Sequence, residues 1–569
     1  MPLESWGLTP KFRLEYWGLT PSLNIMSIRC LVSIVLLAAL GAACSGGSKD
    51  NAYRIETLVS GGPLHGANGI TWGPDDMLYV GSVSSQTVYR VNPETGEAEI
   101  VVPAPAGEAD DIAFAPDGTM VWTALLGGEL RTLREDGSVD AIVSGMALIN
   151  PVYFTTDGRL FAAQVGFDRL YELDPKGGTE PRLVASKIGN LNSFEITDDD
   201  ELYGPLSNIE TVARIDIETG EVTPVAENLG KVVAVNLDSE GNIWAVDWAG
   251  GRLWRIHPIT GARTIVATLQ PPLDNLAIGP DDMVYVSRPA HSAIERVDPE
   301  TGEQQTLVDG NLSLPGGLAI TTHDGREALV VADGYGYRLV DTETGAVTTP
   351  YDLTKFGFPA AASDVAVNDD FFVFSDFGIR PRVYLVDRSN FETVLIWTKI
   401  KMPYGLVLRD NGDPIVTDFA TGALIGLSRA DKKLREIVAD GLDGPVGVEW
   451  AGPGSVYLTE ALGGKLVQVN LEDGKKSIIT GGLAQPEGLT VLMDGRIAVV
   501  EVGKRQLIAI DPVSGAIDIL ATELPVGQPA ARLPAPVYAP SGVVQGADGS
   551  IYLTGDWDNS VLKVLRSSD

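Results

Sequence analysis

The chain has 569 residues, 44% of them hydrophobic, and its formal net charge at pH 7 is −34. This apolar content is enough for a large folded core. The excess of acids argues against nucleic acid and against anionic membrane surfaces as partners, because both are bound through clusters of Lys and Arg. We expect many of the acids to serve the backbone of tight turns rather than to act together as a calcium-binding surface.

The first recognisable pattern is a secretory leader at residues 26–44. Met26 to Arg29 is short and positive, Leu31 to Leu40 is apolar, and small residues then lead to Cys44. An apolar run this short cannot span a bilayer, which needs about 20 residues. The small residues before Cys44 resemble the leader of bacterial lipoproteins, in which the cysteine carries the lipid, although Gly41 stands where leucine is usual.

This resemblance implies an exported protein whose Cys44 is the lipidation site, anchored to the bacterial membrane on its periplasmic or cell-surface side. The alternative is ordinary cleavage nearby, with Cys44 unmodified. Residues 45–52 form a polar tether. Residues 1–25 contain the sequence WGLTP twice and precede the methionine with which a leader would start, so we interpret them as a mis-assigned extension and Met26 as the true start.

From residue 53 onward the chain is built from one repeated unit. Residues 232–267 show it as four short runs rich in Val, Ile, Leu and Trp, separated by turn clusters such as Asp238-Ser239-Glu240-Gly241. The period-two alternation between turns predicts four antiparallel strands joined by hairpins. Such a sheet has two faces to bury, so copies of it must stack. The first turn recurs twelve times at a spacing of about 43 residues, which is typical of β-propeller blades.

Twelve blades predict an all-β chain of two consecutive six-bladed β-propellers with four-stranded antiparallel blades, since a single ring of twelve would leave a wide central hole. A lone strand at residues 53–59 matches the outer strand of a blade, and the last blade, at residues 543–564, lacks one. Because an unpaired edge invites aggregation, we expect residues 53–59 to complete the blade at residues 276–297, and residues 304–308 to complete the last blade. The predicted rings are residues 53–301 and 302–569, and a split into seven and five blades is the alternative.

The first strand of each blade lines the axis of its ring. Two places before the first apolar residue of this strand, five of the six blades in the first ring carry an amide or a carboxylate, and the fifth blade carries Val233. If the turn itself demanded Asn or Asp, both rings would show it, so the polar set in the first ring indicates a function. The residues are Asn68, Asp110, Asn150, Asn192 and Asp274 in the first ring, against Gly316, Ser363, Tyr404, Val446, Glu487 and Ser541 in the second.

We interpret these five oxygen-bearing side chains as a metal site. Two charged and three neutral groups converging on an axis suit a hard cation such as calcium, which takes six to eight oxygens. Asp247, at the end of a second strand, is expected on the same face. Two alternatives stay open. Each side chain could instead bond the loop before its strand, or the alignment could be one residue off, which would bring in Asp111 and Asn275.

Six blades with Asn and Asp before their inner strands resemble the gluconolactonase, senescence-marker-protein and paraoxonase superfamily, and more loosely NHL repeats. The resemblance implies calcium held at the mouth of the funnel and hydrolysis of lactones or esters. Asn150, Asn192 and Asp274 match the amide and carboxylate ligands of that family. Asn68 stands where a glutamate is usual, which lowers the charge of the site and weakens the case for catalysis.

In such a site the cation would polarise the carbonyl of the substrate while a base activates water. The candidate catalytic residues are Asp110, Glu108 and His65, the last in the loop before Asn68. The other three histidines lie at turns or loops and lack metal-ligand spacing. The sequence has no Gly-rich phosphate loop, no Gly-x-Ser-x-Gly and no His-Glu-x-x-His motif.

The second ring has a different regularity, an acidic residue at the end of each second strand. One interpretation is an acidic collar that binds a cation, and the other is one carboxylate per blade capping backbone amides of the neighbouring loop. The structural interpretation is favoured, because like charges on a shared rim repel one another unless each is satisfied locally. The residues are Asp333, Asp376, Asp418, Glu460, Glu501 and Asp556.

Two functional hypotheses follow. The first is a lipid-anchored, extracytoplasmic, calcium-dependent hydrolase of lactones or esters. The second is a non-catalytic ligand- or protein-binding scaffold that offers its loops to a protein or glycan of the cell envelope. The polar set favours chemistry, whereas the duplicated ring and the missing glutamate favour binding.

Overall fold

The computed structural model describes residues 53–134, 136–350, 361–378, 380–529 and 539–567. The predicted leader, Cys44 and the tether lie outside the described residues. Within these ranges the chain is all-β, apart from three single turns of 3-10 helix, η1 (Ser207–Ile209), η2 (Pro289–His291) and η3 (Val502–Lys504). In the described part of the chain, no helix is long and apolar enough to cross a membrane.

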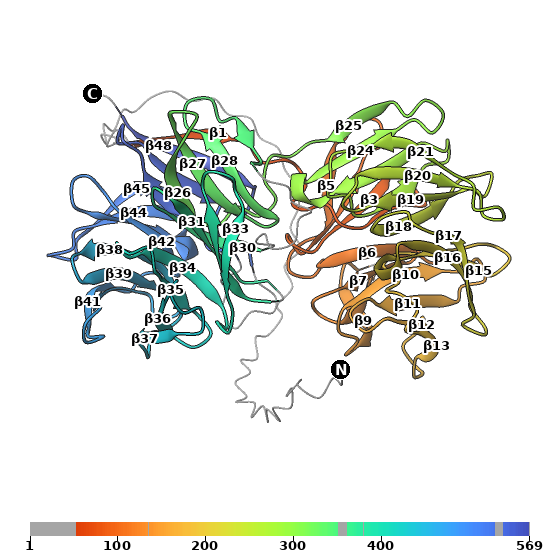
Figure 1. Ribbon diagram of the computed structural model, residues 1–569, viewed down its shortest axis with the longest axis horizontal. Coiled ribbons are helices and arrows are strands. Elements are labelled where there is room, and N and C mark those ends of the chain that lie inside the picture. Colours follow the sequence, from red (N-terminus) through yellow and green to blue (C-terminus); the bar gives the residue numbers. More distant parts are fainter. Residues whose placement is uncertain (1–52, 135, 351–360, 379, 530–538, 568–569) are drawn as a thin grey trace, which may run out of the picture. The chain divides into compact units, whose positions relative to one another are not determined.

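Twelve four-stranded sheets make up two groups of six, the first coloured red to light green and the second green to blue in Figure 1. The sheets of the first group are β2 (Ile70–Trp72) to β5 (Ala98–Val102) with β3 (Leu78–Ser82) and β4 (Thr87–Val91); β6 (Ala109–Phe114), β7 (Met120–Ala124), β8 (Glu129–Leu133) and β9 (Val139–Ser144); β10 (Ile149–Phe154), β11 (Leu160–Gln164), β12 (Arg169–Leu173) and β13 (Arg182–Ser186); β14 (Glu195–Ile196), β15 (Glu201–Leu206), β16 (Thr211–Asp216) and β17 (Val222–Ala226); β18 (Val232–Leu237), β19 (Ile243–Asp247), β20 (Arg252–Ile256) and β21 (Arg263–Thr268); and β22 (Leu276–Ile278), β23 (Val284–Arg288), β24 (Ala293–Val297) and β25 (Gln304–Val308).

The second group has the same plan, but its last sheet takes one strand from the start of the chain. Its sheets are β26 (Leu318–His323), β27 (Arg326–Asp333), β28 (Gly336–Asp341) and β29 (Val347–Thr348); β30 (Ala362–Val367), β31 (Phe371–Asp376), β32 (Arg382–Asp387) and β33 (Thr393–Trp397); β34 (Pro403–Leu408), β35 (Pro414–Asp418), β36 (Ala423–Leu427) and β37 (Arg435–Ala439); β38 (Pro445–Gly452), β39 (Ser455–Glu460), β40 (Lys465–Asn470) and β41 (Lys476–Gly481); β42 (Pro486–Val491), β43 (Ile497–Glu501), β44 (Gln506–Ile510) and β45 (Ile517–Ala521); and β46 (Val543–Gln545), β47 (Ile551–Gly555), β48 (Ser560–Arg566) and β1 (Tyr53–Val59).

The inner strands of each group contact one another in a closed circle. In the first group β2, β6, β10, β14, β18 and β22 follow one another, and β22 contacts β2 again. In the second group β26, β30, β34, β38, β42 and β46 do the same, and β46 contacts β26. Each group is therefore a six-bladed β-propeller, called the first ring and the second ring below. The predicted pair of six-bladed rings is confirmed, and the split into seven and five is wrong.

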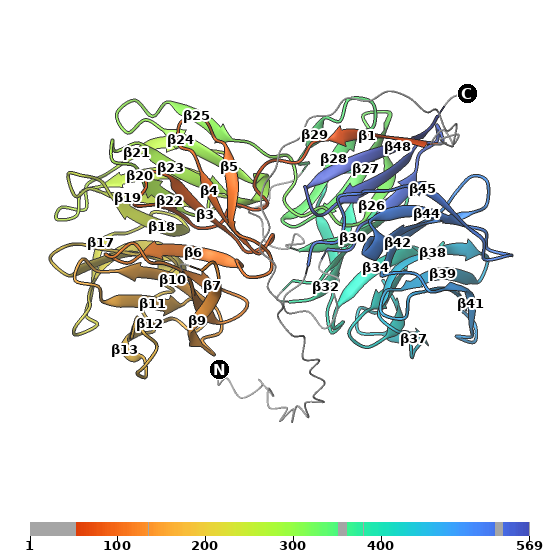
Figure 2. The ribbon, with the colours of Figure 1, turned by 180° about the vertical axis from the view of Figure 1, so that it is seen from behind.

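The closing strands are exchanged relative to our expectation. Strand β1 pairs with β48 of the second ring, with Tyr53 opposite Arg566 and Ile55 opposite Val564. Strand β25 pairs with β24 of its own blade, where Gln304 lies opposite Val297. Figure 2 shows β1, in red, lying along β48. The expected boundary at residues 301/302 is thus wrong for these two strands.

β25 pairs with β24 because a tight turn joins the two strands. Asp298 accepts the N–H groups of Glu300 (3.0 Å) and Thr301 (2.8 Å), so the chain reverses at once and β25 meets the edge of β24. A hairpin partner six residues away closes at a smaller entropic cost than a strand some 240 residues away. The edge of β48 is left for β1.

Burial falls from the central strands of a blade to its outer strand. All five residues of β19 are buried, since neighbouring blades cover both of its faces, and the indole of Trp244 is 0% exposed. Four of the six residues of β21 are exposed. The core therefore lies between blades, as stacking of incomplete sheets requires.

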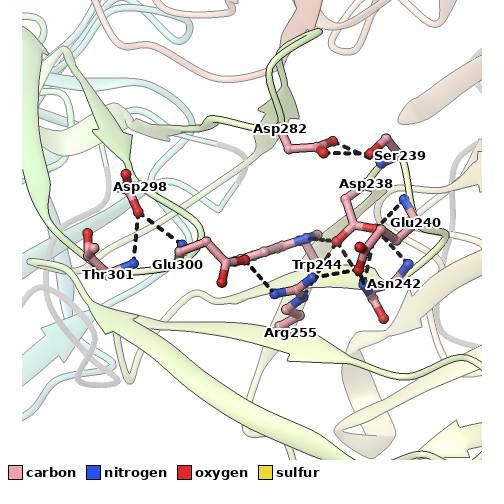
Figure 3. A network of polar contacts seen from close by, with 10 residues as sticks. All are labelled: Asp238, Ser239, Glu240, Asn242, Trp244, Arg255, Asp282, Asp298, Glu300 and Thr301. Carbon is pink, nitrogen blue, oxygen red and sulfur yellow. Dashed lines mark hydrogen bonds and ion pairs between the residues drawn. The ribbon is translucent and has the colours of Figure 1, made fainter.

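Acidic residues at the turns satisfy backbone amides, as expected (Figure 3). Asp238 accepts the N–H of Glu240 at 3.1 Å and the indole N–H of Trp244 at 2.9 Å. Ser239 donates to Asp282 of the next blade through its N–H (2.9 Å) and its hydroxyl (2.6 Å), and so ties neighbouring turns together.

Candidate active site at the mouth of the first ring

The five predicted oxygen-bearing residues lie at one end of the inner strands, called the mouth of the first ring here. Asp110 and Asn150 are the second residues of β6 and β10, and Asn68, Asn192 and Asp274 lie just before β2, β14 and β22. Because these strands contact one another around the ring, the five residues surround the same end of its axis and are called the constellation below. The side chains of Asn68 and Asp274 are in direct contact.

Asn68 holds the carboxylate of Asp274 in place through a hydrogen bond. Its Nδ2 donates to Oδ2 of Asp274 at 3.1 Å and to the hydroxyl of Tyr335 at 3.2 Å. Its Oδ1 accepts the backbone N–H of Val83 at 3.1 Å, and this donor fixes which way the amide points. The carbonyl of Asn68 also accepts the hydroxyl of Ser287. Asn68 is therefore a positioning group for Asp274, and its oxygen already serves the backbone.

Asp110 and Asp274 form a desolvated pair of acids. Burial raises the pKa of the Asp110 carboxyl well above its ordinary value, and repulsion from Asp274 and Asp111 raises it further. Burial also raises the pKa of Asp274, while the hydrogen bond from Asn68 and the attraction of Lys231 oppose the shift. The repulsion between two like charges at one desolvated mouth is relieved by a proton or by a cation.

Two amide oxygens belong to the same mouth as this pair. Asn150 is 6% exposed, and its Oδ1 has no hydrogen-bond partner within the described residues. Asn192 donates its Nδ2 to the carbonyl of Val233 at 3.1 Å, which turns its Oδ1 away from that strand. Buried acceptors without partners are rare in native proteins. The carboxylate of Asp274 and these two amide oxygens, one of them orphaned, are a donor set that fits a hard cation.

No group of three or more His, Cys, Asp or Glu with metal-binding geometry occurs in the described ranges. A cation at this mouth would therefore depend on the amide oxygens of Asn150 and Asn192 and on water for the remaining positions.

The residues that a one-residue shift of the alignment would bring in, Asp111 and Asn275, bind backbone amides. Asp111 accepts the N–H of Val152 from the next inner strand at 3.0 Å, and Asn275 accepts the N–H of Leu276 at 2.8 Å. Asp247 is 1% exposed and bound by Arg252 at 2.8 Å. These three side chains stabilise the propeller, which leaves Asp110 and Asp274 as the acids of the mouth.

Two of the candidate bases lie in other surroundings. His65 borders a separate depression together with Pro63 and Tyr89, and burial lowers its pKa to about 4, so its imidazole stays neutral. Glu108 is 2% exposed and lies 3.5 Å from the guanidinium of Arg131. Asp110 is the candidate base that the fold places in the constellation.

Sequence reasoning missed a cation at this mouth, which lies over an aromatic ring. The Nζ of Lys231 lies 4.2 Å above the ring of Trp248. In the fifth blade, Lys231 lies just before the inner strand β18 and Trp248 just after the second strand β19. The apolar Val233, at the position where the other blades carry an oxygen, was the sequence signal that this blade differs.

The acidic collar of the second ring is structural, as favoured from the sequence. Asp333 accepts the N–H groups of Ser313 (2.9 Å) and Leu314 (2.7 Å). The other five collar residues also cap backbone amides at 3.2 Å or less: Asp376, Asp418, Glu460, Glu501 and Asp556.

No protein-family model matches the chain. Among curated proteins, pentonolactonase XacC from Haloferax volcanii is 28% identical over 235 residues, which cover 37% of this chain and 79% of that protein. Among solved structures, virginiamycin B lyase from Staphylococcus aureus matches with a TM-score of 0.36 and 14% identity, over 49% of this chain and 96% of the lyase. The PQQ-bound form of aldose sugar dehydrogenase from Streptomyces coelicolor matches with a TM-score of 0.35 and 18% identity, over 45% of this chain and 98% of the dehydrogenase. The chain is thus a β-propeller protein with distant similarity to a lactonase.

Proposed function

We propose that the first ring is the catalytic unit of a calcium-dependent hydrolase of lactones or esters. The observation that carries the proposal is the half-buried, mutually repelling pair Asp110 and Asp274, at the same mouth as the partnerless amide oxygen of Asn150. The distant similarity to a pentonolactonase supports a lactone as the substrate class.

Asn150, Asn192 and Asp274 would hold the calcium ion. When bound, it supplies a positive charge that polarises the carbonyl of the substrate and stabilises the oxyanion. Asn68 orients Asp274 by donating to its Oδ2.

Asp110 is the proposed general base. Its carboxylate accepts a proton from the water that attacks the carbonyl carbon, and the desolvation that raises its pKa also makes it a stronger base. His65 has no role in this proposal, since it borders a different depression.

Thermal melting with calcium and with chelator tests the metal site. At 100 times the dissociation constant, calcium should stabilise the wild type by about 2.7 kcal/mol. Asp274→Ala and Asn192→Ala should lose this gain, whereas Asn208→Ala, an exposed asparagine of the same ring, should keep it. Asp110→Asn should lower the rate of lactone hydrolysis by about 10²- to 10⁴-fold, and its melting temperature should still rise with calcium. A wild type whose melting ignores calcium would refute the proposal.

We further propose that the protein is exported and held at the membrane by a lipid on Cys44. In detergent phase separation the wild type should enter the detergent phase and Cys44→Ser the aqueous phase. Equal partitioning of the two proteins would leave Cys44 without this role.

A non-catalytic scaffold is the second candidate, and the second ring favours it. All six of its collar carboxylates bind backbone amides. Because these carboxylates serve the backbone, the second ring is suited to present loops to an envelope protein or glycan, with no membrane contact beyond the anchor.

A further inference from the structure

The fifth blade places an ammonium group at the mouth where the other blades place oxygens. Val233 is 6% exposed and offers no polar atom from its side chain. Two residues earlier, Lys231 is exposed and its Nζ lies 4.2 Å from the centre of the Trp248 ring. An indole face is the strongest aromatic partner for an ammonium ion and holds it in place without neutralising it.

The backbone ties this cation to the acid pair. Trp248 donates its N–H to the carbonyl of Lys231 at 2.9 Å, and Leu273, next to Asp274, donates to the carbonyl of Trp248 at 3.2 Å. Gly230 has a φ of 81°, and a Cβ there would lie 2.6 Å from Oδ2 of Asp247, so the residue before Lys231 must be glycine.

The ammonium group of Lys231 forms no ion pair with a carboxylate of the described residues. Within the described ranges no carboxylate lies at ion-pair distance from its Nζ, although Asp274 is close enough to attract it. Partial desolvation of the amine lowers the pKa of Lys231, and the charge of Asp274 opposes the shift. An exposed amine can also be reprotonated directly by solvent.

Other proton donors of suitable type lie elsewhere. The Nδ1 of His257 faces the turn amide of Ile259 at 3.2 Å, and His291 lies beside Gln270. His323 borders a depression of the second ring, and His65 borders the one described above. Within the described residues, the mouth of the first ring therefore has Lys231 as its nitrogen acid.

We propose that Lys231 is the acid that protonates the leaving oxygen of the substrate, a role that rests on the hydrolase function proposed above. Water attacks the carbonyl carbon and gives one proton to Asp110. The bond between that carbon and the ring oxygen then breaks, its electron pair goes to the ring oxygen, and a proton from Nζ of Lys231 converts this oxygen to a hydroxyl. The product is a hydroxy acid. Asp110 then releases its proton to solvent, and Lys231 takes one up from solvent.

Leaving-group chemistry makes this role testable. An alkoxide released from a sugar γ-lactone is strongly basic and needs an acid, whereas the phenolate released from an aryl ester leaves without one. Lys231→Met should lower kcat for the lactone by about 100-fold or more and kcat for the aryl ester by less than about threefold. Lys231→Arg should not restore the lactone rate, since a guanidinium keeps its proton.

Lys176→Met, an exposed lysine of the same ring, is the matched control and should be unaffected. The calcium-dependent rise in melting temperature should persist in every Lys231 variant. Equal losses on both substrates, or full lactone activity in Lys231→Arg, would overturn the acid role while the hydrolase function stands. A wild type inactive on both substrates would overturn the hydrolase function, and the role of Lys231 with it.

Discussion

At the residue scale, carboxylates beside the axis divide into two kinds according to their donors. Asp111, Glu195 and Asp364 each accept a backbone N–H from the inner strand of the next blade, at 3.0, 2.8 and 3.0 Å. Asp110 and Asp274 accept no such bond from the described backbone. The first kind holds blades together, whereas the second kind has the role in calcium binding and catalysis that we propose.

Asp364 should make the stability of the second ring depend on pH. Burial raises its pKa to about 7, and the charge of Glu449 adds to the shift. The native carboxyl binds its proton more tightly than the unfolded chain does, so its stabilisation is complete below about pH 4 and is lost as the pH rises through about 7. Asp364→Asn keeps an acceptor for the N–H of Leu406 and cannot ionise. Relative to wild type, this variant should gain on the order of 2–3 kcal/mol between pH 5 and pH 8.

Urea unfolding at the two pH values measures this gain. Asp410→Asn, an exposed position in the same ring, is the control and should keep a constant difference from wild type. A constant difference for Asp364→Asn as well would contradict the assigned role.

At the element scale, the second strand of a blade joins neighbouring inner strands through a hydroxyl at its last position but one. Thr459 accepts the N–H of Gly447 in its own blade at 2.9 Å and donates to the carbonyl of Glu487 in the next at 2.6 Å. Thr554 and Gly316 make the equivalent bond across the closure of the second ring at 2.6 Å. Buried groups satisfied in this way set the spacing of the blades.

Strand β1 is the element on which closure of the last blade depends. A chain that starts at residue 60 leaves the edge of β48 without its partner. We expect its peptides from β47 and β48 to exchange amide hydrogens faster than in a chain that starts at residue 53, and we expect some self-association through the open edge. Peptides from β22 to β25 should be unchanged, and hydrogen-exchange mass spectrometry compares the two sets. Faster exchange in β24 instead would show that β1 belongs to the first ring.

At the scale of the whole molecule, the number and class of the blades could be predicted because they depend on local signals. Each repeat contains its own turn clusters and period-two alternation. Twelve such repeats can bury both faces of every sheet in only a few ways. The positions of the polar residues on the inner strands could be predicted for the same reason, since each is fixed relative to its own turn.

The sequence by itself determined the strands, the blades, the six-plus-six count and the end of the ring at which Asn150, Asn192 and Asp274 lie. Only the tertiary structure decided that β1 belongs to the second ring and β25 to the first. Both strands carry the same outer-strand pattern, so their pairing depends on which strand edge is near in space. The tertiary structure also decided that Asp110 joins the acid pair while Asp111 faces the next blade, since a register shift between Ala109 and Ile112 breaks the alternation from which sequence reasoning assigns sides. The apposition of Lys231 and Trp248 likewise joins residues whose meeting depends on how two strands of a blade end, which no pattern along the chain encodes.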